Sequence, residues 1–282
     1  MHYNKIMEQK GMSEFKELIK KWEVLSCNIK ERPIDAPIIL PDIFLVSPSG
    51  AGRTFLLELL ADYLVSRGNL MDFYGDVKYF EFMLNYCPPD QPFSELSRLM
   101  NEVDNAAGFR NEYKGIVFIE IDEWVEHCKE KHFLSLLEYL SDNSHTWLLV
   151  LSLSDRFGKD ADKVEAVVSA FLRTEKVTIE APATCELIEY AKEILDGYGF
   201  ALKADAAKLL CETVDKLREN EYFDGYKTVK KLCADIAYTV YSKPKRAPRW
   251  LGADTIAEFA PDGEYVRKMM IKIEQRKAIG FC

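Results

Sequence analysis

The sequence predicts an α/β protein in which a parallel sheet with helices on both faces is followed by a small helical domain. As far as Pro182, short apolar segments alternate with helix-like segments, an order typical of parallel sheets covered on both faces. After Pro182, apolar side chains recur at helical spacing as far as residue 242, and no strand is expected there. The boundary between the two domains is therefore expected near residues 181–184.

Four regions follow from this pattern. Residues 1–40 are expected to form an N-terminal helix and linker, 41–182 the α/β domain, 183–242 the helical domain, and 243–282 a linker and helical tail. The five strands are expected at 42–46, 77–82, 116–121, 147–152 and 176–180. The helices are expected at 12–27, 53–66, 94–107, 132–140, 185–196, 204–219 and 227–241.

Composition excludes several classes of protein. The 282 residues are 48% hydrophobic and 29% charged, which is ordinary globular composition and not that of a disordered or fibrous chain. The net charge of −9, from 37 basic and 46 acidic residues, disfavours an overall electrostatic attraction to nucleic acid or to an anionic membrane. Seven well-separated cysteines and the absence of a long apolar segment predict a cytoplasmic protein.

A loop with two glycines follows the first expected strand and precedes an amphipathic helix. Its sequence is Ser47-Pro-Ser-Gly-Ala-Gly-Arg-Thr54, and strand–loop–helix is the context of a phosphate-binding loop. Glycines allow backbone amides to turn toward an anion. Arg53 would supply positive charge and Thr54 a hydroxyl for Mg²⁺. Compared with G-x-x-x-x-G-K-[ST], Ser47 replaces glycine and Arg53 replaces lysine, and the longer, forked Arg53 side chain puts ATP turnover in question.

The third expected strand ends in acidic residues, which nucleotide hydrolases use to hold Mg²⁺ and to polarise the attacking water. Two registers are open. A strand ending at Ile119 gives the pair Glu120-Ile121, which lacks a catalytic base, whereas a strand ending at Ile121 gives the complete pair Asp122-Glu123. We adopt Asp122 as the metal ligand and Glu123 as the base.

These motifs together resemble an AAA+ ATPase over residues 40–242. The resemblance rests on the loop at 47–54, the apolar-then-acidic strand at 116–123, the polar-ended strand at 148–154 and the helical segment that follows. Residues 221–232 are similar to the G-N-A-R-x-V-R-x-L stretch of the CbxX/CfqX (stage V sporulation protein K) branch. The resemblance implies a five-stranded P-loop AAA+ sheet, a helical lid, ATP or ADP with Mg²⁺, and a ring or helical homo-oligomer.

The resemblance also implies roles for individual residues. Ser154 or Ser152 would orient the water near the γ-phosphate, and Lys227 would reach the phosphates from the lid. Arg173, with Arg156 as a second candidate, would act on the nucleotide of a neighbouring subunit. Tyr86 lies where many AAA+ proteins carry a pore loop, although a packed tyrosine is the simpler interpretation. The nucleotide-binding residues would be Pro48, Ser49, Gly50, Ala51, Gly52, Arg53, Thr54, Phe55 and Lys227.

Three functions remain open on this evidence. The first is an ATP-binding AAA+ module that couples nucleotide state to oligomer assembly or to chaperone-like remodelling of an unidentified protein partner, with weak hydrolysis. The second is a catalytically inactive scaffold with the same fold. The third is a DNA-associated regulator of the transposition or helicase-loader kind, with the basic segment 243–250 on the nucleic-acid backbone. The acidic balance of the chain speaks against the third.

Overall fold

A computed structural model describes residues 2–9, 12–32, 38–71, 78–107, 114–143, 146–220, 223–244 and 246–269. The chain forms two compact units. The first contains Met1–Pro48 and Gly52–Glu180, and the second contains Ala181–Cys282 together with the loop residues Ser49–Ala51. The first unit thus ends at Glu180, and the expected linker at 181–184 opens the second.

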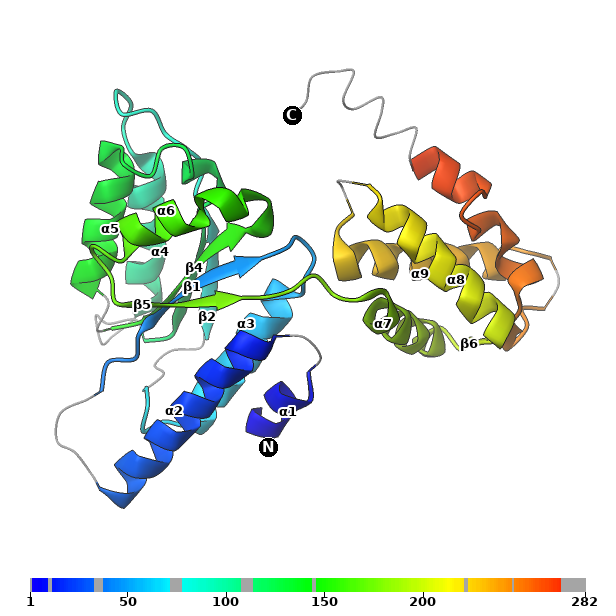
Figure 1. The fold of residues 1–282 in the computed structure, drawn as a ribbon, viewed down its shortest axis with the longest axis horizontal. Helices are drawn as coiled ribbons and strands as arrows, with labels where there is room; N and C mark the ends of the chain where they lie inside the picture. The colour runs from blue at the N-terminus through cyan, green and yellow to red at the C-terminus, as the bar shows by residue number, and fades with distance from the viewer. Residues whose placement is uncertain are drawn as a thin grey trace. The chain divides into compact units, whose positions relative to one another are not determined.

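The first unit is built on a five-stranded, wholly parallel sheet, which confirms the predicted fold class (Figure 1). The strands lie in the order β2-β3-β4-β1-β5. All six residues of β1 are buried, as are the first six of β4, because these strands are covered on both faces. The strands are β1 (Asp42–Ser47), β2 (Tyr79–Met83), β3 (Ile116–Glu120), β4 (Leu148–Ser154) and β5 (Thr174–Thr178).

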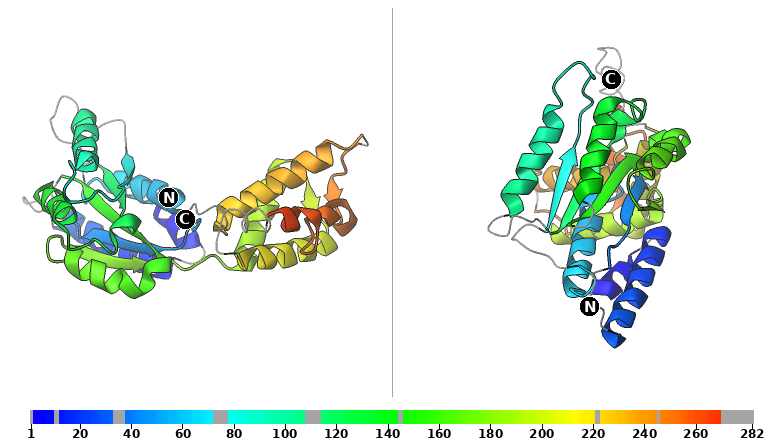
Figure 2. Two further views of the ribbon diagram at one scale, coloured as in Figure 1. Left: turned by 90° about the horizontal axis from the view of Figure 1, so that it is seen from above. Right: turned by 90° about the vertical axis from the view of Figure 1, so that its left-hand side faces the viewer.

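Helices cover both faces of this sheet, as the alternating pattern predicts (Figures 1 and 2). On one face, Phe44 and Val46 of β1 share a buried cluster with side chains from three helices, namely α4 (Ser94–Ala107), α5 (Lys131–Asn143) and α6 (Gly158–Val168). The opposite face carries α1 (His2–Glu8), α2 (Ser13–Glu31) and α3 (Arg53–Ser66).

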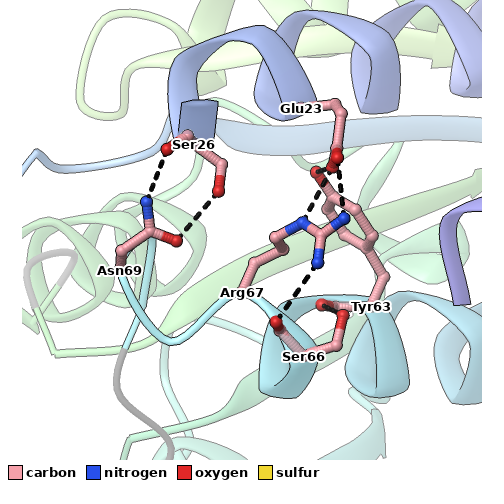
Figure 3. A network of polar contacts seen from close by, with 6 residues as sticks. All are labelled: Glu23, Ser26, Tyr63, Ser66, Arg67 and Asn69. Carbon is pink, nitrogen blue, oxygen red and sulfur yellow. Dashed lines mark hydrogen bonds and ion pairs between the residues drawn. The ribbon is translucent and has the colours of Figure 1, made fainter. Parts of the chain in front are cut away.

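A polar network fastens α2 to α3 (Figure 3). Arg67, immediately after α3, donates from Nε and Nη2 to the two carboxylate oxygens of Glu23 at 2.9 and 2.7 Å. The Tyr63 hydroxyl donates to the same carboxylate at 3.1 Å. One turn further along α2, Ser26 and Asn69 exchange two hydrogen bonds of 2.8 and 2.9 Å. These contacts hold α2 on the helix that begins at the glycine loop.

The second unit packs three helices around one apolar core. It departs from the prediction at one point, because residues 183–242 are not wholly helical. Ala201–Leu202 forms β6, which pairs in parallel with β7 (Trp250–Leu251). The chain turns out of α7 through Gly199, whose φ of 80° suits glycine, and a two-residue strand is too short to show a periodicity. The helices are α7 (Thr184–Gly197), α8 (Ala204–Arg218) and α9 (Gly225–Tyr241).

The remaining differences from the prediction concern the two ends of the chain, α6, and the predicted residues that the structure does not describe. α1 and α6 were not predicted. The expected tail contains the 3-10 helix η4 (Ala253–Phe259) and a short helix at 264–269. The remainder of the tail, and residues 33–37, 77 and 221–222 of other predicted segments, lie outside the described residues. Within the described residues, no helix is both long enough and apolar enough to span a bilayer.

Candidate phosphate-binding site

The glycine loop connects β1 to α3 at the carboxyl edge of the sheet. β1 ends at Ser47 and α3 begins at Arg53. Gly50 and Gly52 have φ values of 68° and 84°, a region that side chains other than glycine rarely occupy. Gly52 caps α3 without a side-chain hydrogen bond to its first amides. A loop of this shape directs backbone N–H groups toward one point, where the positive end of the helix dipole also lies.

Arg53 directs its guanidinium across this edge of the sheet. Its Nη1 lies 2.8 Å from Oε2 of Glu120 and donates to the Ser152 hydroxyl at 3.4 Å. Glu120 and Ser152 are register partners at the carboxyl ends of β3 and β4. The guanidinium carbon also lies 6.0 Å from the centre of the Phe118 ring. Since the Arg53 and Glu120 side chains are only 24% and 19% exposed, the pair is sheltered from bulk water.

Two hydroxyl groups lie at the two ends of the glycine loop, at the end of β1 and the start of α3. Ser47 is 1% exposed, and its Oγ has no hydrogen-bond partner among the described residues. A buried polar atom without a partner costs free energy unless a ligand or water satisfies it. Thr54, the second residue of α3, is exposed. The loop therefore combines turned amides, a cation and available hydroxyl groups.

β3 ends between the two strand ends that the sequence left open, Ile119 and Ile121, so the choice between the two acidic pairs stays a prediction. The strand stops at Glu120, and the next residue, Ile121, is fully buried. The Ile121 amide donates to the Ser152 carbonyl at 3.0 Å, which keeps its side chain in the core. Glu120 is therefore the carboxylate that meets Arg53, a contact that the sequence prediction missed. The signal was Gly115 followed by four apolar residues, which places Glu120 at the strand end.

Asp122 and Glu123 lie in a 3-10 turn just after the strand. Asp122 accepts the backbone N–H of Ser154 at 2.7 Å and a guanidinium N–H of Arg156 at 3.1 Å. Burial raises the pKa of Asp122 above its ordinary value, and the Ser154 amide opposes that shift. Glu123 accepts the backbone N–H of Tyr86 at 2.8 Å. These carboxylates thus have protein partners of their own, and their roles as metal ligand and base stay predictions.

The other predicted residues lie at three different places. Ser154 takes part through its backbone amide, whereas the Ser152 hydroxyl contacts Arg53 directly. Arg173 is exposed at the start of β5, beside Asp42 at the opposite end of β1 from the glycine loop. Five strand residues separate the two edges by roughly 16 Å, so Arg173 does not reach the loop of its own sheet. Lys227, in the second unit, lies 3.4 Å from Asp224.

Tyr86 is packed rather than free. Its ring stacks on His127 at a centroid distance of 3.7 Å, and its hydroxyl donates to Glu130 at 3.0 Å. Glu130 also contacts Nδ1 of His127 at 2.6 Å. This agrees with the simpler interpretation of Tyr86 as a structural residue.

The arrangement suits a polyphosphate anion. No group of three or more His, Cys, Asp or Glu side chains that could hold a metal by itself is found in the described ranges. A phosphate-bound Mg²⁺ needs only one or two protein oxygens, and Thr54, Glu120 and Asp122 offer such oxygens at this edge. A parallel five-stranded sheet in this strand order, with a glycine loop between β1 and α3 and a helical unit after it, is consistent with an α/β P-loop fold followed by a helical domain.

Solved structures of RuvB are similar to this fold. RuvB of Thermotoga maritima, a Holliday junction branch migration motor, matches with a TM-score of 0.53 and 14% identity, over 97% of this chain and 80% of that chain. Two of its variants match with TM-scores of 0.54, at 13% and 14% identity, over 92% and 94% of this chain and 75% and 78% of theirs. No family model and no curated protein matches the sequence. At this identity the likeness concerns the fold.

Proposed function

We propose that this chain is an AAA+ module that binds adenine nucleotide at the glycine loop and couples nucleotide state to its own assembly and to remodelling of a protein partner. The observation that carries the proposal is Arg53. Its guanidinium emerges from a loop of positive-φ glycines and lies between the ends of β3 and β4. A cation at that point, beside uncapped helix amides, favours a bound phosphate.

The described residues fit the proposed ligand. The loop amides would donate to the β- and γ-phosphates. A phosphate oxygen would replace the Glu120 carboxylate as the partner of Arg53. Mg²⁺, when bound, would supply Lewis-acid neutralisation of phosphate charge, with Thr54 and either Glu120 or Asp122 as its protein ligands. Because Arg53 is paired in this structure, nucleotide has to compete with Glu120, which weakens binding relative to a loop with a free cation.

The position of Arg173 supports the proposed assembly. It lies exposed at the edge of the sheet away from the glycine loop, so a role on nucleotide requires a second copy of the chain. We propose that Arg173 contacts the nucleotide of a neighbouring subunit. We also propose that Lys227 contacts the phosphates, as the AAA+ resemblance implies. A closer relationship to the CbxX/CfqX branch stays a prediction.

A second candidate, a nucleotide-binding scaffold without turnover, is favoured by one observation. The residue that directly follows the strand-end acid is Ile121, which is fully buried and carries no carboxylate. Glu123 would have to leave the Tyr86 amide to activate a water. Turnover of ATP by wild type and by Glu123→Gln separates the two candidates, because only an enzyme that uses Glu123 loses activity in the variant.

Sedimentation with and without ATP tests the proposed coupling. The expected result is a larger species with ATP and Mg²⁺ that is lost in Arg173→Ala. Lys163→Ala, at an exposed position on α6, serves as the control and should assemble like wild type. A sedimentation coefficient that ATP does not change would contradict the coupling, although ATP binding itself would stand.

A further inference from the structure

One end of the helical unit exposes four large aromatic side chains. The exposed fractions are 75% for Tyr238, 58% for Tyr241, 56% for Trp250 and 42% for Tyr198. Aromatic rings of this size usually bury most of their surface. Their exposure in a single small unit is therefore a feature that needs an explanation.

Direct contacts and strand pairing bring these residues to the same end of the unit, where α7 and α9 end and β6 pairs with β7. The Tyr241 hydroxyl donates to the Tyr198 carbonyl at 2.7 Å, and its ring lies 4.8 Å from that of Phe200. Tyr238 precedes Tyr241 by one helical turn of α9. Trp250 is the register partner of Ala201, the residue after Phe200. We call Tyr198, Tyr238, Tyr241 and Trp250 the aromatic end.

Positive charge gathers at the aromatic end although the whole chain is acidic. Between Asp235 and Asp254 the sequence contains four basic residues and no acidic one. Three of the four, Lys243, Arg246 and Arg249, are described and exposed.

These three cations differ from two lysines on α8 of the same unit, which are ion-paired. Within the described ranges none of the three has an ion-pair partner, and Lys243 donates only to the Thr255 carbonyl at 3.4 Å. Lys208 and Lys216, both on α8, pair with Glu212 and Glu219. The Asp205 carboxylate accepts hydrogen bonds from the backbone N–H groups of Ala206 and Ala253. Lys243, Arg246 and Arg249 are thus left without a carboxylate partner within the described part of the chain.

We propose that the aromatic end, with Lys243, Arg246 and Arg249, binds single-stranded nucleic acid. Exposed rings stack on unpaired bases, while cations beside them neutralise phosphates. An acidic peptide would use the cations but leave the rings without partners, and a duplex would keep its bases inaccessible to them. This binding goes beyond nucleotide binding at the glycine loop and does not depend on it.

Trp250 supplies a direct signal for the test. Of the four tryptophans, Trp22, Trp124 and Trp147 are 3%, 0% and 4% exposed, so Trp250 alone is open to solvent. Titrating the full chain with a thymidine oligonucleotide of about 20 nucleotides should quench its fluorescence, because the site size for stacking surfaces of this kind is about 4–16 nucleotides. Trp250→Leu keeps an apolar side chain but should abolish the quenching and weaken binding, measured by anisotropy of a labelled oligonucleotide, about tenfold.

Charge variants separate phosphate contacts from general attraction. The double variant Arg246→Ala, Arg249→Ala should weaken binding at least tenfold and flatten its salt dependence, since about 0.7 of a counterion is released per neutralised phosphate of a single strand. The matched control, Lys208→Ala with Lys216→Ala, removes two lysines that are already ion-paired on the same unit and should bind like wild type.

The outcomes are decisive in each arm. Quenching that is lost in Trp250→Leu, with normal binding by the control, supports the proposal. Equal binding of polyglutamate by wild type and Trp250→Leu would instead identify an acidic protein partner and overturn it. Absence of quenching, or equal loss in the control, would also overturn it. Repeating the titration with Arg53→Ala shows whether the two sites are independent, because that variant should still bind the oligonucleotide.

Discussion

Arg67→Ala should destabilise the first unit through the contact between α2 and α3. Arg67 makes two hydrogen bonds, of 2.9 and 2.7 Å, to the carboxylate of Glu23, and the two side chains are only 23% and 24% exposed. Hydrogen bonds to charged groups contribute about 1.5–3 kcal/mol in buried positions. Because a quarter of each side chain is in water, we take the lower end and expect a total loss of about 2–3 kcal/mol.

Thermal unfolding followed by circular dichroism measures this loss. For a domain of this size, 1 kcal/mol corresponds to about 2–4 °C in Tm, so the variant should unfold roughly 5–10 °C lower. The control is Lys20→Ala on the same helix α2, which removes an ion pair to Glu17 whose side chains are 51% and 65% exposed. Because solvent screens this exposed pair, its loss should leave Tm nearly unchanged.

The same contact predicts a pH dependence. Arg67 lowers the pKa of Glu23 below its ordinary value of 4.5, so the folded state favours the charged form. The contribution is therefore fully present above pH 4.5 and is lost as the pH falls through the lowered pKa. The difference in stability between wild type and Arg67→Ala should shrink in acid. Equal destabilisation by Arg67→Ala and Lys20→Ala, or a difference that grows in acid, would refute the reasoning.

Three further predictions concern other parts of the first unit. Burial raises the pKa of Asp42 from 3.8 to about 7, so stability should fall by up to about 4 kcal/mol between pH 4 and 7. Asp42→Asn should remove this fall in stability with pH, measured by urea unfolding at several pH values. An unchanged pH dependence in the variant would contradict the assignment to Asp42. Glu120→Gln should free Arg53 and tighten ADP binding in EDTA several-fold by calorimetry; weaker binding would show that Glu120 does not compete. Gly52→Ala, at a φ of 84°, should lower the free energy of unfolding by about 1–2 kcal/mol and reduce Tm accordingly. An unchanged Tm would show that the loop relaxes to accept the side chain.

Much of the fold could be predicted because its elements carry strong local signals. The helices at Arg53–Ser66 and Ser94–Ala107 were predicted with their observed bounds, since the first follows a glycine and the second a proline-rich loop. The five strands were each found within two residues of their observed ends, apart from the start of the second predicted strand at residue 77, which is not described. α6 was missed because charged residues separate Ala161, Val164 and Val168, although their spacing is helical.

The site was harder to predict, for a physical reason. Ile119 and Ile121 are both buried, so side-chain burial could not show whether the strand stops before or after Glu120. The backbone decides this, through the pairing of Glu120 with Ser152. The partner of Arg53 was a second ambiguity. Whether its long side chain reaches β3 depends on its rotamer, which the sequence pattern does not show. By contrast, the strand, glycine loop and helix could be predicted from their order along the chain, whereas the loop's role in binding phosphate stays a prediction.

Calorimetry of ATP and ADP with Mg²⁺ tests the central claim most directly. Arg53→Ala is compared with Arg98→Ala, a matched control whose arginine pairs with Glu95 at 2.6 Å and lies 5.7 Å from the ring centre of Phe82. We predict micromolar binding by wild type and Arg98→Ala, and binding at least tenfold weaker by Arg53→Ala. No binding by wild type at millimolar nucleotide, or equal binding by both variants, would contradict a nucleotide site at the glycine loop.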